Sequence, residues 1–449
     1  MNIHFIAIGG AAMHNLAIAL HKKGHQVTGS DDEIFDPAKS NLERYGLLPK
    51  ATGWFPEKIT NATEAIILGM HARKDNPELL RAQELNIPIY SYPAFVYHQT
   101  QQKKRIVVGG SHGKTTITSM IMHALQQCGK KFDYLVGAQL AGFETMVGLS
   151  EDADIAVIEG DEYLASPIQM VPKFHLYHPD IAIISGIAWD HINVFPTFEN
   201  YCEQFSIFID KIQAGGKLIY CANDTTLVDV VQKNQRTDIS KIAYAVPSHT
   251  IENGVTSILF EGKKYALEIF GQHNLMNLES ARLACEAVGI SAHEFYTAMQ
   301  TFLGAAKRLE TLVKKETSVV FKDFAHSPSK LKASIDAVKQ QYPSRKLYAI
   351  MELHTFSSLN KTFLQEYENT MQSADEAVVF YSPKTIEHKR LEPISKQDIK
   401  AAFAQDNLHV IDTPEELASY FQKITRNNAN VLLMSSGNWG GLSLTDFFN

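Results

Sequence analysis

The sequence predicts an α/β protein with several domains built around parallel sheets, and three observations lead to this prediction. The chain has 449 residues, roughly three times the ~150 residues of an average domain. Short runs of β-branched residues alternate with longer stretches of helical character from end to end, which is the pattern of strands joined by crossover helices. Two glycine-rich turns each follow a predicted strand and open a predicted helix, as nucleotide-binding folds require.

Composition and charge exclude several classes of protein. With 42 basic and 49 acidic residues the formal charge is -7, which argues against a broad nucleic-acid-binding surface. No run approaches the ~20 apolar residues of a membrane-spanning helix, so no membrane association is expected. The four cysteines are far apart and are expected to be reduced core residues. The apolar N-terminus lacks the basic region of a signal peptide, and we expect a cytoplasmic protein.

The first predicted domain covers residues 1–102. Its β-branched runs predict strands at 3–8, 26–29, 65–68 and 87–90, with a helix over 11–23 after the first strand. The polar and basic stretch 99–105 precedes a fresh apolar strand. We therefore place the first domain boundary after residue 102.

The second predicted domain covers residues 103–302, and the third covers 303–449. In the second, strands are expected at 106–108, 155–158, 181–184 and 218–220, an antiparallel hairpin at 255–260 and 264–270, and helices from about 276 to 287 and on to about 302. In the third, strands are expected at 319–321, 346–350, 377–380, 408–411 and 431–434. Each domain thus repeats the alternation of strand and helix.

The strongest local signal is the segment Gly109-Gly110-Ser111-His112-Gly113-Lys114-Thr115-Thr116 between a strand and a helix. A bound phosphate needs backbone N–H donors, the positive end of a helix and a cation, and this segment supplies all three. Lys114 is expected to reach the terminal phosphates, and the Thr115 hydroxyl to ligate Mg²⁺. Val108 stands where the full consensus has glycine, so a plain turn between strand and helix is the alternative.

Two further strand ends carry candidate polar groups. The strand at 155–158 is followed by Glu159, Asp161 and Glu162, and we expect Glu159 to be the carboxylate that binds Mg²⁺, because this ion prefers oxygen ligands; a solvated acidic loop is the alternative. His191 follows the strand at 181–184. It is a candidate ligand of a second Mg²⁺ or a proton-transfer group, or else a half-buried structural histidine.

Two weaker signals complete the site. Asn274 and Asn277, next to His273, are three residues apart, so on a helix they share a face; their carboxamides suit the edge of a purine, and helix capping is the alternative. In the first domain, Gly9-Gly10 and Met13 follow the first strand, and Ser30-Asp31 follow the second. This resembles a dinucleotide-binding turn, although Ala7 and Ala12 replace its glycines and packing alone would also explain it.

Taken together, the motifs resemble those of the Mur ligase family. The resemblance covers essentially the whole chain and rests on four segments, which are 110–116, His273-Asn274 with Asn277, Lys307-Arg308-Leu309-Glu310, and Asp323-Phe324-Ala325-His326-Ser327-Pro328. It implies three domains, with a Rossmann-like N-terminal domain for a UDP-sugar, a central P-loop ATPase domain and a Rossmann-like C-terminal ligase domain.

The resemblance also implies an activity. The expected reaction is ATP-dependent and ADP-forming, uses Mg²⁺, and joins L-alanyl-γ-D-glutamyl-meso-diaminopimelate to the lactyl carboxylate of UDP-N-acetylmuramate through an acyl phosphate in peptidoglycan recycling. The alternatives are L-alanine as the incoming amine, or a non-catalytic relative. The segment 352–359 departs from the family pattern, because His354 and its neighbours replace an expected Arg-containing segment. The oligomeric state does not follow from the sequence.

Residue roles are carried over from the family in the same way. The resemblance implies catalytic roles for Lys114, His191 and Arg308. Nucleotide contacts are expected from Gly110, Ser111, His112, Gly113, Lys114, Thr115, Thr116, His273, Asn274, Asn277, Arg308 and Asp323. Metal contacts are expected from Thr115, Glu159 and His191, and substrate contacts from Gly10, Met13, Ser30, Asp31, His71 and His326.

Overall fold

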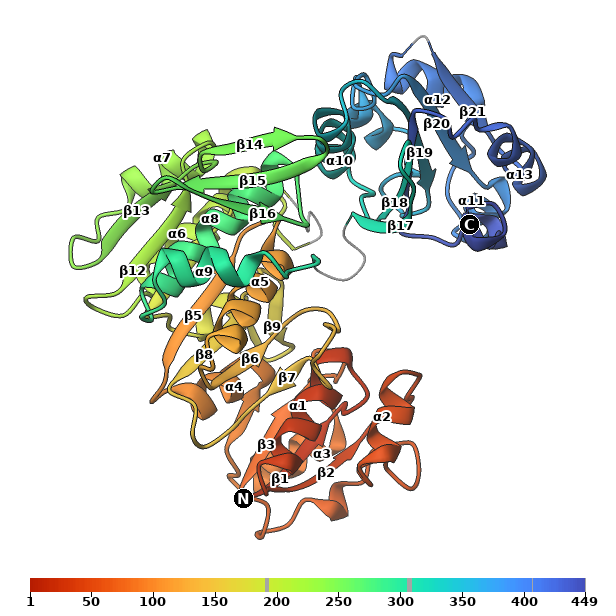
Figure 1. Ribbon diagram of the computed structural model, residues 1–449. Coiled ribbons are helices and arrows are strands. Elements are labelled where there is room, and N and C mark those ends of the chain that lie inside the picture. Colours follow the sequence, from red (N-terminus) through yellow and green to blue (C-terminus); the bar gives the residue numbers. More distant parts are fainter. Residues whose placement is uncertain (190–193, 305–308, 406, 449) are drawn as a thin grey trace. The chain divides into compact units, whose positions relative to one another are not determined.

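The computed structural model describes residues 1–189, 194–304, 309–405 and 407–448. Strands and helices alternate along the chain, and three mainly parallel sheets of four, seven and six strands carry most of the strands (Figure 1). The predicted α/β architecture with parallel sheets in the N-terminal, middle and C-terminal regions is confirmed. No helix in these residues is long and apolar enough to cross a membrane.

The N-terminal sheet has four parallel strands in the order β2-β1-β3-β4. Its first strand ends two residues earlier than predicted, because Ala7 turns the chain with a φ of 68°. The elements of this region are β1 (Asn2–Ile6), α1 (Ala11–Lys22), β2 (Gln26–Ser30), α2 (Ala38–Arg44), η1 (Pro56–Lys58), β3 (Ala65–Leu68), α3 (Pro77–Glu84), β4 (Ile89–Ser91) and α4 (Tyr92–Thr100).

The central sheet has seven strands in the order β13-β12-β11-β5-β8-β6-β7, and all but β7 are parallel to their neighbours. The strand β5 lies in its interior, between β11 and β8. The elements are β5 (Lys104–Gly109), α5 (Lys114–Gln127), β6 (Phe132–Leu135), β7 (Val147–Gly148), β8 (Ile155–Glu159), β9 (Leu164–Ser166), β10 (Gln169–Pro172), η2 (Lys173–Leu176), β11 (Ile181–Ile184), α6 (Phe198–Asp210), β12 (Lys217–Cys221), α7 (Thr225–Lys233), β13 (Ser240–Tyr244), α8 (Gln272–Glu286) and α9 (Ala292–Met299).

The C-terminal sheet has six strands in the order β17-β18-β22-β19-β20-β21, with β17 antiparallel to β18. A separate antiparallel sheet is formed by β14 (His249–Glu252), β15 (Val255–Phe260) and β16 (Lys263–Leu267). The remaining elements are β17 (Glu310–Lys314), β18 (Val319–Asp323), α10 (Pro328–Gln341), β19 (Lys346–Leu353), η3 (Phe363–Tyr367), β20 (Glu376–Tyr381), α11 (Pro383–His388), α12 (Lys396–Phe403), β21 (Leu408–Ile411), α13 (Pro414–Lys423), β22 (Ala429–Met434), η4 (Trp439–Gly441) and η5 (Leu444–Asp446).

The chain divides into two compact units, one of Met1–Pro247 with Met276–Phe302 and one of Ser248–Leu275 with Leu303–Asn449. The three-stranded sheet therefore belongs to the second unit, although it lies within the predicted second domain. Its middle strand β15 and the turn before it are bonded to α10, because Thr256 Oγ1 donates to Gln341 Oε1 at 2.7 Å and Gln341 Nε2 donates to the Gly254 carbonyl at 2.7 Å. The domain limits at 102 and 302 stay a prediction.

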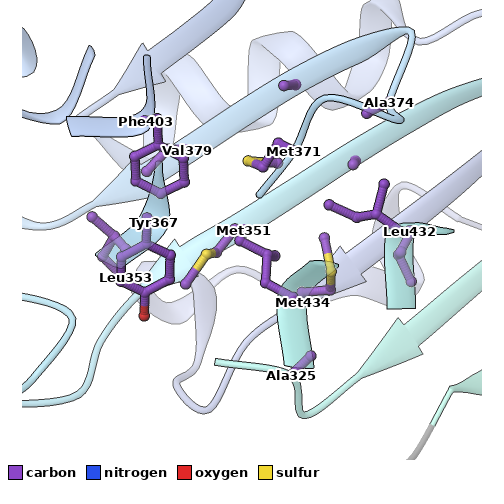
Figure 2. Close-up of a cluster of buried hydrophobic side chains, with 14 of the residues drawn as sticks. Ala325, Met351, Leu353, Tyr367, Met371, Ala374, Val379, Phe403, Leu432 and Met434 are labelled. Atoms are coloured by element: carbon purple, nitrogen blue, oxygen red, sulfur yellow. The ribbon is translucent and has the colours of Figure 1, made fainter. Parts of the chain in front are cut away.

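Alternating residues of the C-terminal sheet face two separate cores, as the period of two along a strand requires. On one face, Met351 and Leu353 of β19 and Met434 of β22 pack with Tyr367 and with Phe403 of α12 (Figure 2). On the other face, residues such as Ile350 and Leu433 pack with α13 and Trp439. Burial on both faces explains why these strands read as continuous apolar runs.

Candidate functional site

The predicted phosphate-binding loop lies between the end of β5 and the start of α5. Gly110 and Gly113 have φ values of 120° and 78°. A Cβ on Gly110 would lie 2.2 Å from Ser185 Oγ, and a Cβ on Gly113 would lie 2.4 Å from Asn277 Oδ1. Both positions therefore require glycine for conformation and for space. Val108 is buried inside β5, so its departure from the consensus precedes the loop.

Lys114 begins α5 and is held by two oxygen acceptors. Its Nζ donates to the Gly110 carbonyl at 2.7 Å and to Glu162 Oε2 at 2.8 Å. Burial opposes the charge on Lys114, but the surrounding carboxylates, Glu162 foremost, raise its pKa overall. The lysine is therefore a fixed cation at the positive end of a helix, which is the electrostatic setting that a phosphate requires.

Glu159 ends β8, which pairs with β5 in parallel, and it lies beside Thr115. Thr115 Oγ1 donates to Glu159 Oε1 at 2.9 Å, and the Gly137 amide donates to Glu159 Oε2 at 2.7 Å. Burial raises the pKa of Glu159, although the amide of Gly137 and the charge of Lys114 oppose the rise. A buried carboxylate next to a hydroxyl and a phosphate-binding loop fits Mg²⁺, which takes few protein ligands beside phosphate oxygens.

No group of three or more His, Cys, Asp or Glu side chains within the described residues could hold a metal ion by itself. His191, the candidate second ligand, lies outside the described residues.

The other loop residues are tied to the strand end of β11 and to α6. Ser111 N donates to the Gly186 carbonyl at 3.0 Å, and its hydroxyl accepts from Ala188 N at 2.8 Å. Ser111 Oγ also lies 3.0 Å from the Tyr201 hydroxyl, which in turn lies 3.4 Å from Glu162 Oε1. The hydroxyl of Ser185 donates to the carbonyl of His112, and Thr116 is buried in the first turn of α5.

Sequence reasoning gave no role to Glu162 or Tyr201. Glu162 could be noticed only as one of several carboxylates after a strand. Nothing in the sequence around Tyr201 indicates that it reaches the loop, because its position depends on how α6 packs.

Helix α8 begins at Gln272, four residues before the predicted start, so His273 and Asn274 lie inside it rather than before it. Asn277 lies beside Gly113, because a Cβ added to Gly113 would lie 2.4 Å from Asn277 Oδ1. Asn274 Nδ2 donates to the Phe270 carbonyl at 2.9 Å, so this side chain is bonded to the backbone one turn earlier. The boundary between the two compact units falls within this helix.

Four of the five predicted substrate residues of the first unit lie at the carboxyl ends of β1 and β2 or in the helix turn that follows. Gly10 precedes α1, and Met13 is buried in its first turn. Asp31 Oδ2 accepts from Gly9 N at 2.7 Å, while Ser30 is fully buried and accepts from Lys58 Nζ at 3.4 Å. His71 is exposed after β3.

Two further predicted residues of the second unit, Asp323 and His326, lie at or just after the carboxyl end of β18. The hydroxyl of Ser334 donates to the buried carboxylate of Asp323. His326 Nδ1 lies 2.8 Å from the Phe324 carbonyl, and the Tyr367 hydroxyl donates to the His326 carbonyl. Arg308 lies outside the described residues.

A buried carboxylate that the sequence did not single out as a site lies two strands from β18, at the end of β19. Glu352 accepts from the Ser435 hydroxyl and from Trp439 N, the latter at 2.9 Å, and its Oε1 lies 3.7 Å from His354 Nδ1. A Cβ on Gly437 would lie 2.6 Å from His354 Nδ1. The strand ends of β19 and β22, which are neighbours in the sheet, thus form one packed polar cluster.

The phosphate loop, its lysine and the adjoining carboxylate on a parallel sheet define a protein that binds a nucleoside triphosphate. Comparison with protein families specifies the class further. Residues 2–104 match the model of the Mur ligase family catalytic domain, residues 108–285 the Mur ligase middle domain, and residues 307–437 the Mur ligase glutamate ligase domain. The chain belongs to the Mur ligase family and is an ATP-dependent, ADP-forming acid–amino-acid ligase.

Full-length relatives of two kinds are similar to the chain. It is 27% identical to the UDP-N-acetylmuramate–L-alanine ligase of Desulfitobacterium hafniense, over 97% of each chain. It is 26% identical to the UDP-N-acetylmuramate–L-alanyl-gamma-D-glutamyl-meso-2,6-diaminoheptandioate ligase of Escherichia coli, over 98% of this chain and 96% of that protein. These values do not separate the two specificities.

Solved structures show the same fold. A murein peptide ligase from Psychrobacter arcticus superposes with a TM-score of 0.62 and 22% identity, covering 99% of this chain and 98% of that one. The UDP-N-acetylmuramate-alanine ligase from Thermotoga maritima gives a TM-score of 0.67 with 19% identity, covering 98% and 96%.

Proposed function

We propose that the chain joins the lactyl carboxylate of UDP-N-acetylmuramate to the amine of L-alanyl-γ-D-glutamyl-meso-diaminopimelate. The carboxylate takes the γ-phosphoryl group of ATP to form an acyl phosphate and ADP. The amine then attacks the acyl carbon, the new C–N bond forms, inorganic phosphate leaves and the amine proton is released. The observation that carries the proposal is the half-buried Lys114 at the start of α5, 2.8 Å from Glu162 and next to the Thr115–Glu159 pair.

The residues of the loop would act by position and charge. A carboxylate and a triphosphate repel each other, so the site must neutralise charge and hold the reactants in line. Lys114 and the N-terminus of α5 supply positive charge from the protein. Thr115 and Glu159 would hold Mg²⁺, which supplies the remaining neutralisation when it is bound.

The remaining assignments are proposals that rest on family resemblance. Asn277 would contact adenine, which its place beside Gly113 supports. Asp323 would contact the ribose or a group next to it, and His326 the side of the incoming amine. Arg308 would supply further positive charge, and His191 a second metal contact, with amine deprotonation as its alternative role.

In the first unit, Gly10, Met13, Ser30 and Asp31 would frame the UDP group, with His71 close to it. The first four lie at the carboxyl ends of two neighbouring strands or in the helix turn that follows, which is where α/β sheets bind nucleotides.

The incoming amine separates the proposal from its nearest alternative. The segments Glu159-Gly160-Asp161-Glu162-Tyr163 and Met434-Ser435-Ser436-Gly437-Asn438-Trp439-Gly440-Gly441 resemble those of ligases that use the tripeptide. The segment around His354 replaces the Arg-containing segment expected for peptide recognition, so L-alanine stays the alternative amine.

A competition assay decides between the two amines. Purified protein with UDP-N-acetylmuramate and Mg·ATP is given tripeptide, L-alanine or an equal mixture, and ADP release and the amide product are measured. We expect turnover with the tripeptide and, from the mixture, predominantly the tripeptide product. Turnover with L-alanine and none with the tripeptide would contradict the proposal.

A further inference from the structure

One chain segment, residues 136–146 between β6 and β7, contacts both the candidate metal ligand and the first helix of the N-terminal sheet. At one end, Gly137 N donates to Glu159 Oε2 at 2.7 Å. A Cβ on Gly137 would lie 2.7 Å from Glu159 Oε1, so backbone and carboxylate are in close contact. At the other end, Met146 N donates to Asn15 Oδ1 at 2.9 Å.

The two ends of the segment are joined directly. Val136 N donates to the Met146 carbonyl at 3.0 Å, so Met146 is bonded to Asn15 through its amide and to the residue before Gly137 through its carbonyl. Only backbone groups and the short side chain of Asn15 lie on this path from α1 to Glu159. Because the path contains no long, flexible side chain, a shift of Asn15 is expected to shift Gly137 and with it Glu159.

The orientation of the Asn15 amide is fixed by its other partners. Asn15 Nδ2 donates to the Ala11 carbonyl at 2.8 Å and lies 3.0 Å from His14 Nε2, while His14 Nδ1 lies 2.9 Å from the Gly10 carbonyl. The carbonyl can only accept, so His14 Nδ1 carries the proton and, in the neutral ring, Nε2 accepts from Asn15. Asn15 Oδ1 is therefore left to accept from Met146, and the network begins at Gly10.

We propose that Asn15 is a positioning residue for Glu159, so that a ligand at the Gly10 turn and Mg²⁺-nucleotide at the phosphate loop favour each other's binding. The inference rests on the proposed function, which places the UDP group at Gly10 and the metal at Glu159. A ligand that orders the first turn of α1 also orders Asn15 and the segment 136–146. The second ligand then meets a site that is already ordered, and less conformational entropy is lost when it binds.

The coupling is measured by calorimetric titration of a non-hydrolysable ATP analogue with Mg²⁺, in the absence and presence of saturating UDP-N-acetylmuramate. In the wild-type protein we expect UDP-N-acetylmuramate to tighten nucleotide binding by about fivefold or more, within the usual range of coupling between sites. In Asn15→Leu, both ligands should still bind, and the ratio of affinities should fall to about one.

A matched control tests whether the coupling depends on the Asn15 path or on any contact between α1 and the segment 136–146. Lys22 Nζ lies 2.5 Å from Glu144 Oε2, so Lys22→Met removes an exposed ion pair between α1 and the same segment without touching the proposed path. Its affinity ratio should equal that of the wild type. Gly137→Ala tests the path from the end next to Glu159. It replaces Asn15→Leu as the test if that variant does not fold. It should bind UDP-N-acetylmuramate normally and lose the coupling.

A wild-type ratio of one with both ligands bound would overturn this inference and leave the proposed function intact. Unchanged coupling in either Asn15→Leu or Gly137→Ala would overturn it as well. Failure of UDP-N-acetylmuramate to bind the wild-type protein would overturn the proposed function itself, and the inference with it.

Discussion

The ammonium group of Lys114 lies 2.8 Å from a carboxylate oxygen of Glu162, and the Glu162 side chain is only 2% exposed. A triphosphate bound at the loop and the carboxylate of Glu162 are therefore two negative partners for the same cation. This relationship makes the ion pair part of the energetics of ATP binding.

Lys114→Ala should abolish most ADP release while the protein remains folded. Loss of one preorganised cation at a phosphoryl-transfer site is expected to lower turnover by about 100- to 1000-fold. Glu162 loses its partner, which should reduce the free energy of unfolding by up to about 3–5 kcal/mol. Steady-state ADP release and thermal unfolding measure the two effects. Lys173→Ala, which breaks the neighbouring and more exposed pair with Asp161, is the control and should keep near-normal turnover.

Glu162→Gln should strengthen nucleotide binding. The substitution keeps the shape of the side chain but removes a buried negative charge close to the bound phosphates. We expect the dissociation constant of an ATP analogue, measured by calorimetry, to fall by about three- to tenfold, which corresponds to about 0.7–1.4 kcal/mol. Weaker binding in this variant would show that Glu162 assists the phosphates through Lys114 rather than competing with them.

Gly113→Ala should prevent nucleotide binding, and Gly129→Ala should not. Both glycines have positive φ, 78° and 65°, so both substitutions incur the backbone penalty of about 1–2 kcal/mol. At Gly113 the new Cβ would lie 2.4 Å from Asn277 Oδ1, whereas at Gly129 nothing lies within 4 Å. Equal ATP-analogue affinities in the two variants would show that the contact with Asn277 is not needed for binding.

The stability of the first unit should depend on the titration of Asp31. Burial raises the pKa of Asp31 to about 6, with the Gly9 amide opposing the rise and Asp32 adding to it. Between about pH 4 and pH 6, Asp31 therefore keeps its proton in the folded state, whereas in the unfolded chain, with an ordinary pKa of 3.8, it has released the proton. Wild-type stability is therefore lost as pH rises from about 4 to about 6.

Asp31→Asn removes this titration and retains an acceptor for the Gly9 amide. The variant should match the wild type below about pH 4 and exceed it by up to about 3 kcal/mol above about pH 6. Denaturant unfolding from about pH 3 to about pH 8 measures the difference. A difference that does not change with pH would mean that Asp31 titrates alike in the folded and unfolded chain.

The sequence predicted the parallel strands well because those strands are buried on both faces and read as apolar runs. The strand 65–68 was predicted with the bounds that it has in the structure. The start of α8 was missed by four residues, since Gly271 and the polar residues after it look like a turn. Strand β14 of the three-stranded sheet was not predicted, because its sequence His249-Thr250-Ile251-Glu252 has too few apolar residues to indicate a strand.

In the candidate site too, some residues could be predicted from local sequence patterns and others could not. The residues at 110–116 and Glu159 could be singled out because a loop or strand end brings each of them to one edge of a sheet. Tyr201 reaches the phosphate loop through the packing of α6, and Gly137 reaches Glu159 through the segment 136–146. Asn15 of α1 contacts the other end of that segment. No local pattern encodes those contacts, and a single sequence does not reveal them.

The transfer of oxygen isotope from substrate to phosphate tests the central claim most directly. UDP-N-acetylmuramate labelled with ¹⁸O in its lactyl carboxylate is turned over with Mg·ATP and the tripeptide, and the released inorganic phosphate is analysed by mass spectrometry. Activation of the carboxylate as an acyl phosphate predicts one ¹⁸O atom in each phosphate formed. Unlabelled phosphate released together with the amide product would contradict the account.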